Sequence, residues 1–248
     1  MTSVKLLEQH FFASAPSLSA ESHPSGWLIR SSAGYTKRGN SASPLDPSTP
    51  LTEASLAGIK SKLRPPAIIR ITPLAHEEDD ELLEQLGWKH LDPSIVMTRT
   101  LDRRPPASDS TLKTSVSSAP TSSWVRGFAT ASNLSPSHTE TFRSTLNLIR
   151  TPFIPAYITL LDQASHAVAY GQAVRSDHVV GLYNIVVSAE HRGKGYGRAV
   201  TQALLDWGRA EGATTAYLQV TVGNAVGRRM YERMGFEEAY RYHYRVAP

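Results

Sequence analysis

A glycine-rich run at residues 192–197, R-G-K-G-Y-G, constrains the fold of this chain more than any other feature. It follows an apolar run at residues 182–187 and precedes a helix-like segment at residues 198–209. Glycines let the backbone adopt unusual dihedral angles and approach a ligand closely. The free N–H groups and positive dipole end of the following helix favour phosphate. The order strand, glycine turn, helix therefore predicts a site for a phosphorylated cofactor.

The spacing of the glycines separates this run from two other phosphate-binding loops. A P-loop needs G-x-x-x-x-G-K-[ST], a pattern that the sequence lacks. A dinucleotide-binding loop needs a further small residue three positions after Gly195, where Arg198 stands. The pattern that matches is R-x-x-G-x-G, through Arg192, Gly195 and Gly197.

A second pattern follows downstream. Residues 213–220 predict a short buried strand, and residues 224–234 predict a helix that ends before a Gly-Phe pair at 235–236. This stretch fits N-x-x-A-x-x-x-Y-x-x-x-G-F, except that Gly227 stands in place of alanine and should weaken the helix by ~1 kcal/mol. With both patterns in order, residues 123–248 resemble the GNAT superfamily of acyl-CoA-dependent N-acyltransferases.

The resemblance implies an α/β (α+β) fold, with a mixed, mainly antiparallel sheet flanked by helices, and acetyl-CoA as the cofactor. In the family, the glycine-rich loop wraps the pyrophosphate of coenzyme A, here with Arg192, Gly193, Lys194, Gly195, Tyr196, Gly197 and Arg198. The strand before the loop splays from its neighbour and holds the pantetheine arm with its backbone amides, at the positions of Ile185, Val186 and Val187. Asn224 matches an asparagine that caps the next helix and contacts pantetheine. Tyr231 matches the tyrosine that often acts as general acid on the departing thiolate and lies beside the cofactor.

The general base is not identified by the sequence. The strand before the loop offers Tyr183 and Asn184, which are poor bases at neutral pH but are expected to contact the acceptor. His178, just before that strand, is a candidate catalytic residue because imidazole titrates near neutral pH. His243 is a comparable candidate, and a chain of water molecules is the third. The last strand alternates tyrosines with basic residues, so Tyr242 and His243 are expected to border the acceptor cleft.

The chain divides into two predicted domains. Residues 103–122, rich in proline, serine and threonine, are expected to be a linker. They separate an N-terminal domain, residues 1–102, from the acyltransferase domain, residues 123–248. A helix, a glycine, an aromatic residue and a strand follow one another at 81–101, as they do at 231–246. This echo suggests a smaller, degenerate GNAT-like N-terminal domain that has no cofactor loop of its own.

A second unusual run occupies residues 26–41, G-W-L-I-R followed by G-Y-T-K-R-G-N-S. Its glycines and β-forming residues predict two strands joined by a small turn. The run resembles a stretch that precedes the acyltransferase domain in some two-part bacterial members of the superfamily. Its polar residues suggest a place at the domain interface or in acceptor binding, although a plain hairpin would explain them as well.

Composition excludes several other classes of function. The 248 residues include no cysteine, which excludes disulfides, thiolate metal sites and an acyl-cysteine intermediate, and no metal site is expected. The net charge of +4 comes from scattered residues and does not call for a nucleic-acid partner. No apolar run approaches the ~20 residues of a membrane span. Residues 1–15 are expected to form a helix instead of a secretion signal, because polar residues at 8–10 interrupt the apolar stretch.

These observations predict a cytoplasmic N-acetyltransferase, monomeric or homodimeric, that moves an acetyl group from acetyl-CoA to a primary amine by direct transfer in a ternary complex. A small-molecule acceptor such as an amino acid is favoured, because the N-terminal domain could enclose the cleft. A protein N-terminus or lysine is an alternative acceptor. A non-catalytic module that binds acyl-CoA is the alternative of a different class.

Overall fold

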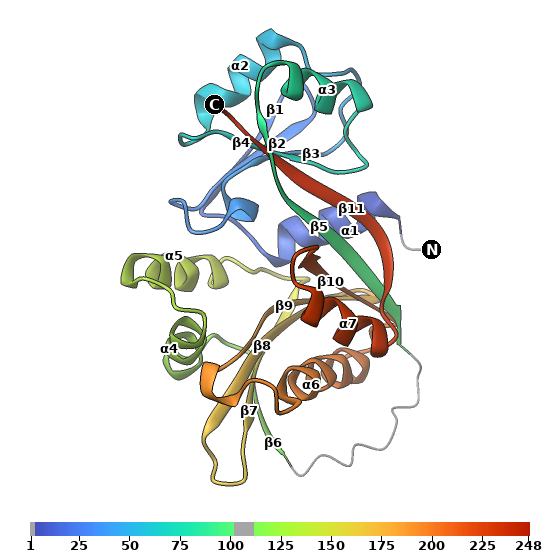
Figure 1. Cartoon of the computed structure of the whole chain (residues 1–248). Helices are drawn as coiled ribbons and strands as arrows, with labels where there is room; N and C mark the ends of the chain where they lie inside the picture. Colours follow the sequence, from blue (N-terminus) through green and yellow to red (C-terminus); the bar gives the residue numbers. More distant parts are fainter. Residues whose placement is uncertain (1–2, 102–111) are drawn as a thin grey trace.

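The computed structural model describes residues 3–101 and 112–248, which form one eleven-stranded sheet with helices on both faces (Figure 1). The N-terminal elements are α1 (Val4–Ser14), β1 (Ser19–His23), β2 (Trp27–Ser31), the 3-10 helix η1 (Lys37–Gly39), β3 (Ala42–Pro44), α2 (Glu53–Lys62), β4 (Ile68–Ile71), α3 (Glu77–Gln85) and β5 (Lys89–Thr100). The C-terminal elements are β6 (Lys113–Ser117), α4 (Ser122–Ala131), α5 (Pro136–Leu146), β7 (Ile154–Leu161), β8 (Ala167–Ser176), β9 (Val179–Val187), the 3-10 helix η2 (Ala189–His191), α6 (Tyr196–Ala210), β10 (Thr215–Thr221), α7 (Ala225–Arg233) and β11 (Glu237–Val246).

The two parts of the chain exchange their last strands. The strand order is β1-β2-β3-β4-β11-β5-β10-β9-β8-β7-β6, so β5 lies between β10 and β11, and β11 lies between β4 and β5. Only the β3/β4 and β9/β10 pairs are parallel among the described strands. The expectation of a mixed, mainly antiparallel α/β sheet is thus confirmed, and Figure 1 shows β5 and β11 as the two long strands that join both parts.

The same chain turn leads into both exchanged strands. Gly87 after α3 and Gly235 after α7 have φ angles of +76° and +80°, which favour glycine. The following aromatic residues then donate their backbone N–H groups to the preceding helix, Trp88 to the Leu83 carbonyl at 2.9 Å and Phe236 to that of Tyr231 at 3.0 Å. The echo between the two parts of the sequence therefore corresponds to a repeated helix–glycine–aromatic–strand geometry.

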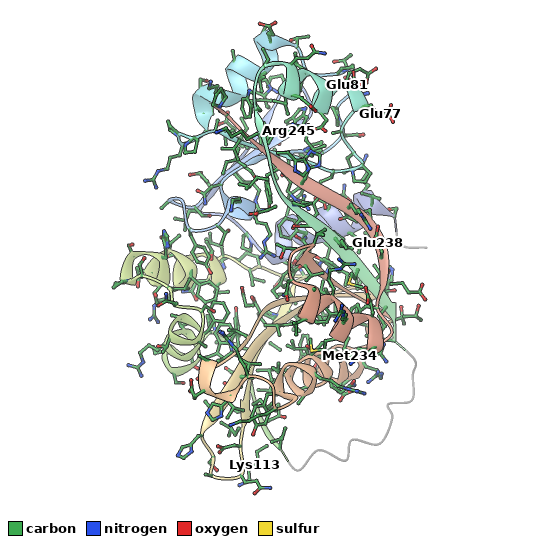
Figure 2. The ribbon with its side chains drawn as sticks, viewed as in Figure 1. Glu77, Glu81, Lys113, Met234, Glu238 and Arg245 are labelled. Atoms are coloured by element: carbon green, nitrogen blue, oxygen red, sulfur yellow. The ribbon has the colours of Figure 1, made fainter. Side chains whose placement is uncertain are left out.

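Ion pairs fix the end of β11 in the N-terminal part. The Arg245 guanidinium donates to Asp80 at 2.7 Å and to Glu84 at 2.9 Å, both on α3. Figure 2 labels Arg245 at this end of the molecule, together with Glu77 and Glu81 of α3. The N-terminal core, which includes Trp27 and Leu83, is separate from the C-terminal core, which includes Val200 and Leu218. A third cluster joins them and contains Leu7, Phe11, Val96, Val174, Val179, Tyr183, Tyr217, Tyr240, Tyr242 and Tyr244.

A fully buried ion pair stabilises this third cluster. Both side chains of Glu8 and Arg70 are 0% exposed, and Arg70 Nη2 donates to Glu8 Oε1 at 2.9 Å. Tyr240 also donates its hydroxyl to Glu8. Glu8→Gln should lower the free energy of unfolding by about 3–5 kcal/mol, because it leaves the Arg70 charge buried without a counter-charge. Urea unfolding measures this, with Glu238→Gln at the exposed pair to Arg241 as control, expected to cost about 0–1 kcal/mol. Equal losses of stability in both variants would contradict the conclusion that Glu8 compensates the buried charge of Arg70.

Two expectations about the chain's organisation need correction. Residues 103–111 of the predicted linker lie outside the described residues, but Lys113–Ser117 forms β6, an edge strand paired with β7. A serine- and threonine-rich edge strand buries little, so its composition resembles that of a linker. In the run at 26–41 the first strand is β2, but the second, β3, begins only at Ala42. The intervening residues form a hydrogen-bonded loop.

Candidate active site

Strands β9 and β10 diverge at the point where the glycine-rich loop approaches. They pair in parallel from Val179 with Thr215 to Leu182 with Leu218, yet β9 continues to Val187 and β10 to Thr221. Along residues 183–187, no described strand pairs with β9 on the side facing β10. Backbone groups on that side are therefore available to a ligand that enters between the strands.

A β-bulge lies at the start of the divergent segment. Gln172 pairs with Tyr183 and Tyr170 with Val186, so one extra residue is inserted in β9, and Asn184 has a φ of +52°. The Asn184 side chain donates to Gln172 Oε1 at 2.6 Å. Bulges leave one residue unpaired and turn the strand, and they are common beside active sites.

The glycine-rich loop presents an open backbone to solvent. Gly193 and Gly195 have φ angles of +76° and +81°, and a Cβ at either position would meet nothing within 4 Å. Helix α6 begins at Tyr196 without a side-chain cap, so the N–H groups of its first turn are free to bind an anion. This is the strand, glycine turn and helix expected from the sequence.

Basic side chains surround this loop without acidic partners. Arg192, Lys194 and Arg198 are exposed, and none of them forms an ion pair with a described residue. Arg192 contacts the end of β9, since its Nε donates to the Val187 carbonyl at 3.3 Å. Unpaired cations around free amides make a strongly positive site suited to a pyrophosphate.

The loop, the end of β9 and helix α7 meet at Gly197. A Cβ built there would lie 3.4 Å from Met230 Sδ and 3.7 Å from Val187 Cγ2. Ile185 and Val187 pack against the C-terminal core, whereas Val186 packs against the aromatic cluster of α4 and α5 on the opposite face. These three residues thus serve as core through their side chains, and their backbones run along the divergent edge.

Helix α7 carries the predicted capping asparagine and general acid. Asn224 Oδ1 accepts from the Gly227 N–H at 3.0 Å, which is the expected cap. Tyr231 is 9% exposed, lies in the same core cluster as Ile185 and Val187, and packs edge-on against Phe236 at 5.9 Å. Burial raises the pKa of Tyr231 to about 12, so the phenol stays protonated at neutral pH.

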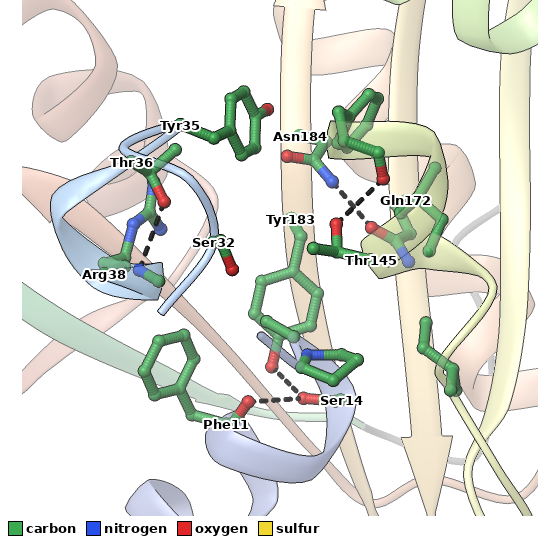
Figure 3. A pocket seen from close by; sticks show the side chains of 16 residues that line it. Phe11, Ser14, Ser32, Tyr35, Thr36, Arg38, Thr145, Gln172, Tyr183 and Asn184 are labelled. Carbon is green, nitrogen blue, oxygen red and sulfur yellow. Dashed lines mark hydrogen bonds between the residues drawn. The ribbon is translucent and has the colours of Figure 1, made fainter. Parts of the chain in front are cut away.

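A cavity lies on the other side of β9, between both parts of the chain (Figure 3). Tyr183 and Asn184 line it, together with the end of α1, the β2–β3 loop, α5 and Gln172. Figure 3 shows Tyr35, Thr36 and Arg38 of that loop across from Asn184. The volume is about 80 Å³, several times the minimum of about 10–15 Å³ that one water molecule needs. A cavity of this size suits a small acceptor group.

A buried hydroxyl network supports the cavity wall. The Tyr183 hydroxyl is hydrogen-bonded to those of Ser14 and Tyr217, and Tyr217 is bonded to His10 Nδ1 at 2.9 Å. Burial raises the pKa of Tyr183 to about 12, against the hydrogen bonds from Ser14 and Tyr217 and the charge of Arg38. The network is therefore uncharged and acts as rigid support for β9.

Burial of His10 predicts a pH-dependent stability. Burial lowers its pKa from 6.5 to about 4, although a backbone hydrogen bond at Val179 and the Asp177 charge oppose the shift. The unfolded chain then binds more protons between pH 6.5 and pH 4, so stability should fall by up to about 3 kcal/mol as the pH drops through that window. Urea unfolding at several pH values should show that His10→Phe loses less stability between pH 6.5 and pH 4 than the wild-type protein. An equal loss of stability in both proteins would contradict the prediction.

Three expected residues lie away from the cavity. His178 occupies the β8–β9 turn, where its carbonyl accepts from Thr214 and Thr215, and it precedes Tyr183 by five residues, or roughly 16 Å along the strand. His243 Nε2 contacts Asp80 at 2.8 Å. Neither histidine reaches the divergent segment, so the geometry gives no support to the expected catalytic role of His178 or to the expected acceptor-binding role of His243.

Tyr242 also lies away from the cavity at Asn184, where it was expected to border the acceptor. Its hydroxyl donates to Gln219 Oε1 at 2.9 Å, and its ring lies under Arg70, 3.9 Å from the guanidinium carbon. It lines a neighbouring cavity with Ser94 and Thr221 instead of the one at Asn184. The tyrosines of β11 do share one face, as expected, but that face packs in the third cluster.

Several cavity residues were not singled out from the sequence. Those of α1 and α5, such as Phe11, Ser14, Phe142 and Thr145, belong to ordinary amphipathic helices and carry no motif. The residues of the β2–β3 loop lie in the run at 26–41, whose unusual polarity was the one available signal.

No described helix combines the length and the apolar character needed to cross a membrane. Likewise, the described residues contain no group of three or more side chains arranged to hold a metal ion.

Comparison with known proteins identifies the family. A family model described as "Probable histone acetyltransferase Rv0428c C-terminal" matches residues 2–245. The "Uncharacterized N-acetyltransferase YobR" of Bacillus subtilis is 29% identical over 227 residues, which are 89% of each chain. The "[Ribosomal protein bS18]-alanine N-acetyltransferase" of Escherichia coli is 38% identical over 58 residues, 23% of this chain and 39% of that protein.

Solved structures share the fold. A GCN5-related N-acetyltransferase from Kribbella flavida has a TM-score of 0.63 at 16% identity, covering 98% of this chain and 93% of the other. A GCN5-related N-acetyltransferase from Sphaerobacter thermophilus has a TM-score of 0.60 at 19% identity, covering 78% and 64%. With the family model matching nearly the whole length, the chain belongs to the Rv0428c C-terminal acetyltransferase family and is an acyl-CoA-dependent N-acetyltransferase of the GNAT type.

Proposed function

We propose that this enzyme transfers an acetyl group from acetyl-CoA to the primary amine of a small molecule, by direct transfer in a ternary complex. The observation that carries the proposal is the divergence of β9 and β10, with the glycine-rich loop at one end and the small cavity of Tyr183 and Asn184 alongside. Cofactor and acceptor can then approach the same stretch of β9 from different directions.

The residues present fit coenzyme A. Free N–H groups at the start of α6 and the unpaired charges of Arg192, Lys194 and Arg198 would hold the pyrophosphate. The divergent backbone at Ile185, Val186 and Val187 would pair with the pantetheine arm, with Asn224 beside it. Acetyl-CoA supplies the acetyl group as a thioester, and a β9 backbone N–H would polarise its carbonyl.

Proton transfer requires a donor for the thiolate and an acceptor for the amine proton. Tyr231 is the proposed donor, because it is neutral and buried, and because its neighbour Met230 lies beside Gly197, as does Val187 at the end of β9. Neither a carboxylate nor an imidazole lines the cavity among the described residues. We therefore propose that the amine loses its proton to water, and His178 has no part in the mechanism.

We further propose that residues 1–102 form a degenerate GNAT-like domain and residues 123–248 the catalytic domain. The order β3-α2-β4-α3-β5 parallels β9-α6-β10-α7-β11, including one parallel strand pair in each and the exchanged last strands. The segment between β3 and α2 contains no glycine, whereas the one between β9 and α6 holds two. One cofactor site per chain follows from this difference.

A protein acceptor is the second candidate. The family description names a probable histone acetyltransferase, and the relative from Escherichia coli is named for ribosomal protein bS18. Mass spectrometry after incubation with acetyl-CoA decides between the two, using amino acids, polyamines, aminoglycosides and lysine or N-terminal peptides as acceptors. Acetylation of free small amines is expected, whereas modification of the peptides alone would favour the second candidate.

A further inference from the structure

The β2–β3 loop that forms one wall of the cavity is cross-linked by its own hydrogen bonds. Asn40 Oδ1 accepts from the backbone N–H groups of Ser32 at 2.8 Å and Gly34 at 2.9 Å, and Asn40 Nδ2 donates to the Thr36 carbonyl at 2.7 Å. Thr36 Oγ1 accepts from the Gly39 N–H at 3.2 Å. The polar residues of the run at 26–41 therefore build a loop of fixed geometry beside the acceptor cavity.

A buried arginine ties this loop to helix α1. Arg30 is 2% exposed, and its guanidinium donates to the carbonyl groups of Ala15 and, at 3.1 Å, Arg38. The guanidinium also lies over the rings of Phe11 and Phe12, at 5.1 and 5.2 Å. Both segments that Arg30 joins line the cavity, so Arg30 is a positioning residue for its wall.

Arg38 is the one charged side chain in the cavity lining that the structure describes. The remaining lining residues are apolar or carry hydroxyl and amide groups. Its guanidinium forms neither a hydrogen bond nor an ion pair with any described residue. Burial raises the pKa values of Tyr35 and Tyr183, and the positive charge of Arg38 lowers both of them. The guanidinium is therefore close enough to affect tyrosines on both walls of the cavity. Arg38 is exposed, so its guanidinium is solvated and open to a ligand, and a cation without a protein partner at a small polar cavity favours an anionic group on that ligand.

We propose that Arg38 binds a carboxylate of the acceptor, so that the acceptor is a small amine that also carries an acid group. This inference rests on the proposed function of the same cavity. A guanidinium presents two parallel N–H donors that match the two carboxylate oxygens. A polyamine would instead bring further positive charge to Arg38, with no carboxylate in the described lining to compensate it.

Matched acceptors test the proposal by free-thiol release from acetyl-CoA. Each natural amino acid is compared with its amide and its decarboxylated amine. 2-Aminoethyl phosphate tests whether the cavity prefers a phosphate to a carboxylate. The wild-type enzyme should acetylate at least one amino acid with a kcat/KM about 10- to 100-fold above that of its amide. Arg38→Gln should remove that preference by raising the KM of the amino acid to about that of its amide. Arg38→Lys should restore part of it, because it keeps the charge without the two parallel donors.

Arg64→Gln is the matched control. Like Arg38, Arg64 is exposed, but it lies outside the lining of this cavity. Its guanidinium donates to the Ala33 carbonyl at 2.9 Å, so its replacement also removes one positive charge close to the β2–β3 loop. The acid-to-amide ratio should stay at the wild-type value. An unchanged ratio in Arg38→Gln, no turnover of any amino acid, or faster turnover of the aminoalkyl phosphate would overturn the carboxylate assignment. Failure of the wild-type enzyme to bind coenzyme A in calorimetry would instead count against the proposed function itself.

Discussion

Tyr231→Phe should lower kcat by about 100- to 10,000-fold while leaving the affinity for coenzyme A nearly unchanged. The substitution removes the proposed proton donor but keeps the ring, which packs edge-on against Phe236 in the C-terminal core. Steady-state thiol release measures kcat, and calorimetry measures the affinity. The affinity separates loss of the proton donor from a packing defect. A packing defect in α7 would also disturb the neighbouring glycine-rich loop and so weaken binding of coenzyme A.

Tyr157→Phe is the control for this prediction. Tyr157 is also buried, but it lies in the aromatic cluster with Trp124, on the face of the sheet opposite Ile158 and the C-terminal core. Loss of its hydroxyl should leave kcat near the wild-type value. If Tyr231→Phe turns over as fast as the control, Tyr231 has no role in proton transfer.

Gly195→Leu should weaken binding of coenzyme A by more than about 100-fold. The new side chain would occupy the open space above the loop, where the pyrophosphate is proposed to lie, and would block approach to the α6 N–H groups. Loss of two charge-assisted hydrogen bonds, at about 1.5–3 kcal/mol each, accounts for this magnitude. Calorimetry with coenzyme A measures the change.

Gly87→Leu separates backbone strain from obstruction of the ligand. Gly87 has a φ of +76°, close to the +81° of Gly195, and equally open surroundings, but it lies at the end of α3 in the N-terminal part. Both variants should lose about 1–2 kcal/mol of stability from the left-handed conformation. Only Gly195→Leu should lose affinity, and undiminished affinity in that variant would contradict the loop assignment.

Local patterns made the geometry of the glycine-rich turn and of helix α7 predictable. The glycine turn, the Asn224 cap and the Gly-Phe end of α7 each depend on neighbours within a few residues, so the sequence contains the whole cause. Likewise, the turn at Gly87 and Trp88 repeats that at Gly235 and Phe236 because the same short hydrogen-bonded ending forms twice.

The acceptor side of the site depends on contacts between segments far apart in the sequence, which local patterns do not reveal. His243 and Asp80 meet across 163 positions, because β11 is inserted between β4 and β5. No local pattern indicates that exchange, so the sequence alone places the last strand beside the acceptor. The wall of the cavity has the same origin, since α1, the β2–β3 loop and α5 converge there without a shared motif. The Ser/Thr-rich β6 was mistaken for linker because an edge strand needs little apolar sequence.

Time-dependent release of free thiol from acetyl-CoA, with and without a panel of small amines, shows directly whether this protein acetylates small amines. We expect release that requires an amine, saturates with it and disappears in Gly195→Leu. Thermal stabilisation by coenzyme A without thiol release for any small amine or peptide would contradict amine acetylation and indicate a protein that only binds acyl-CoA.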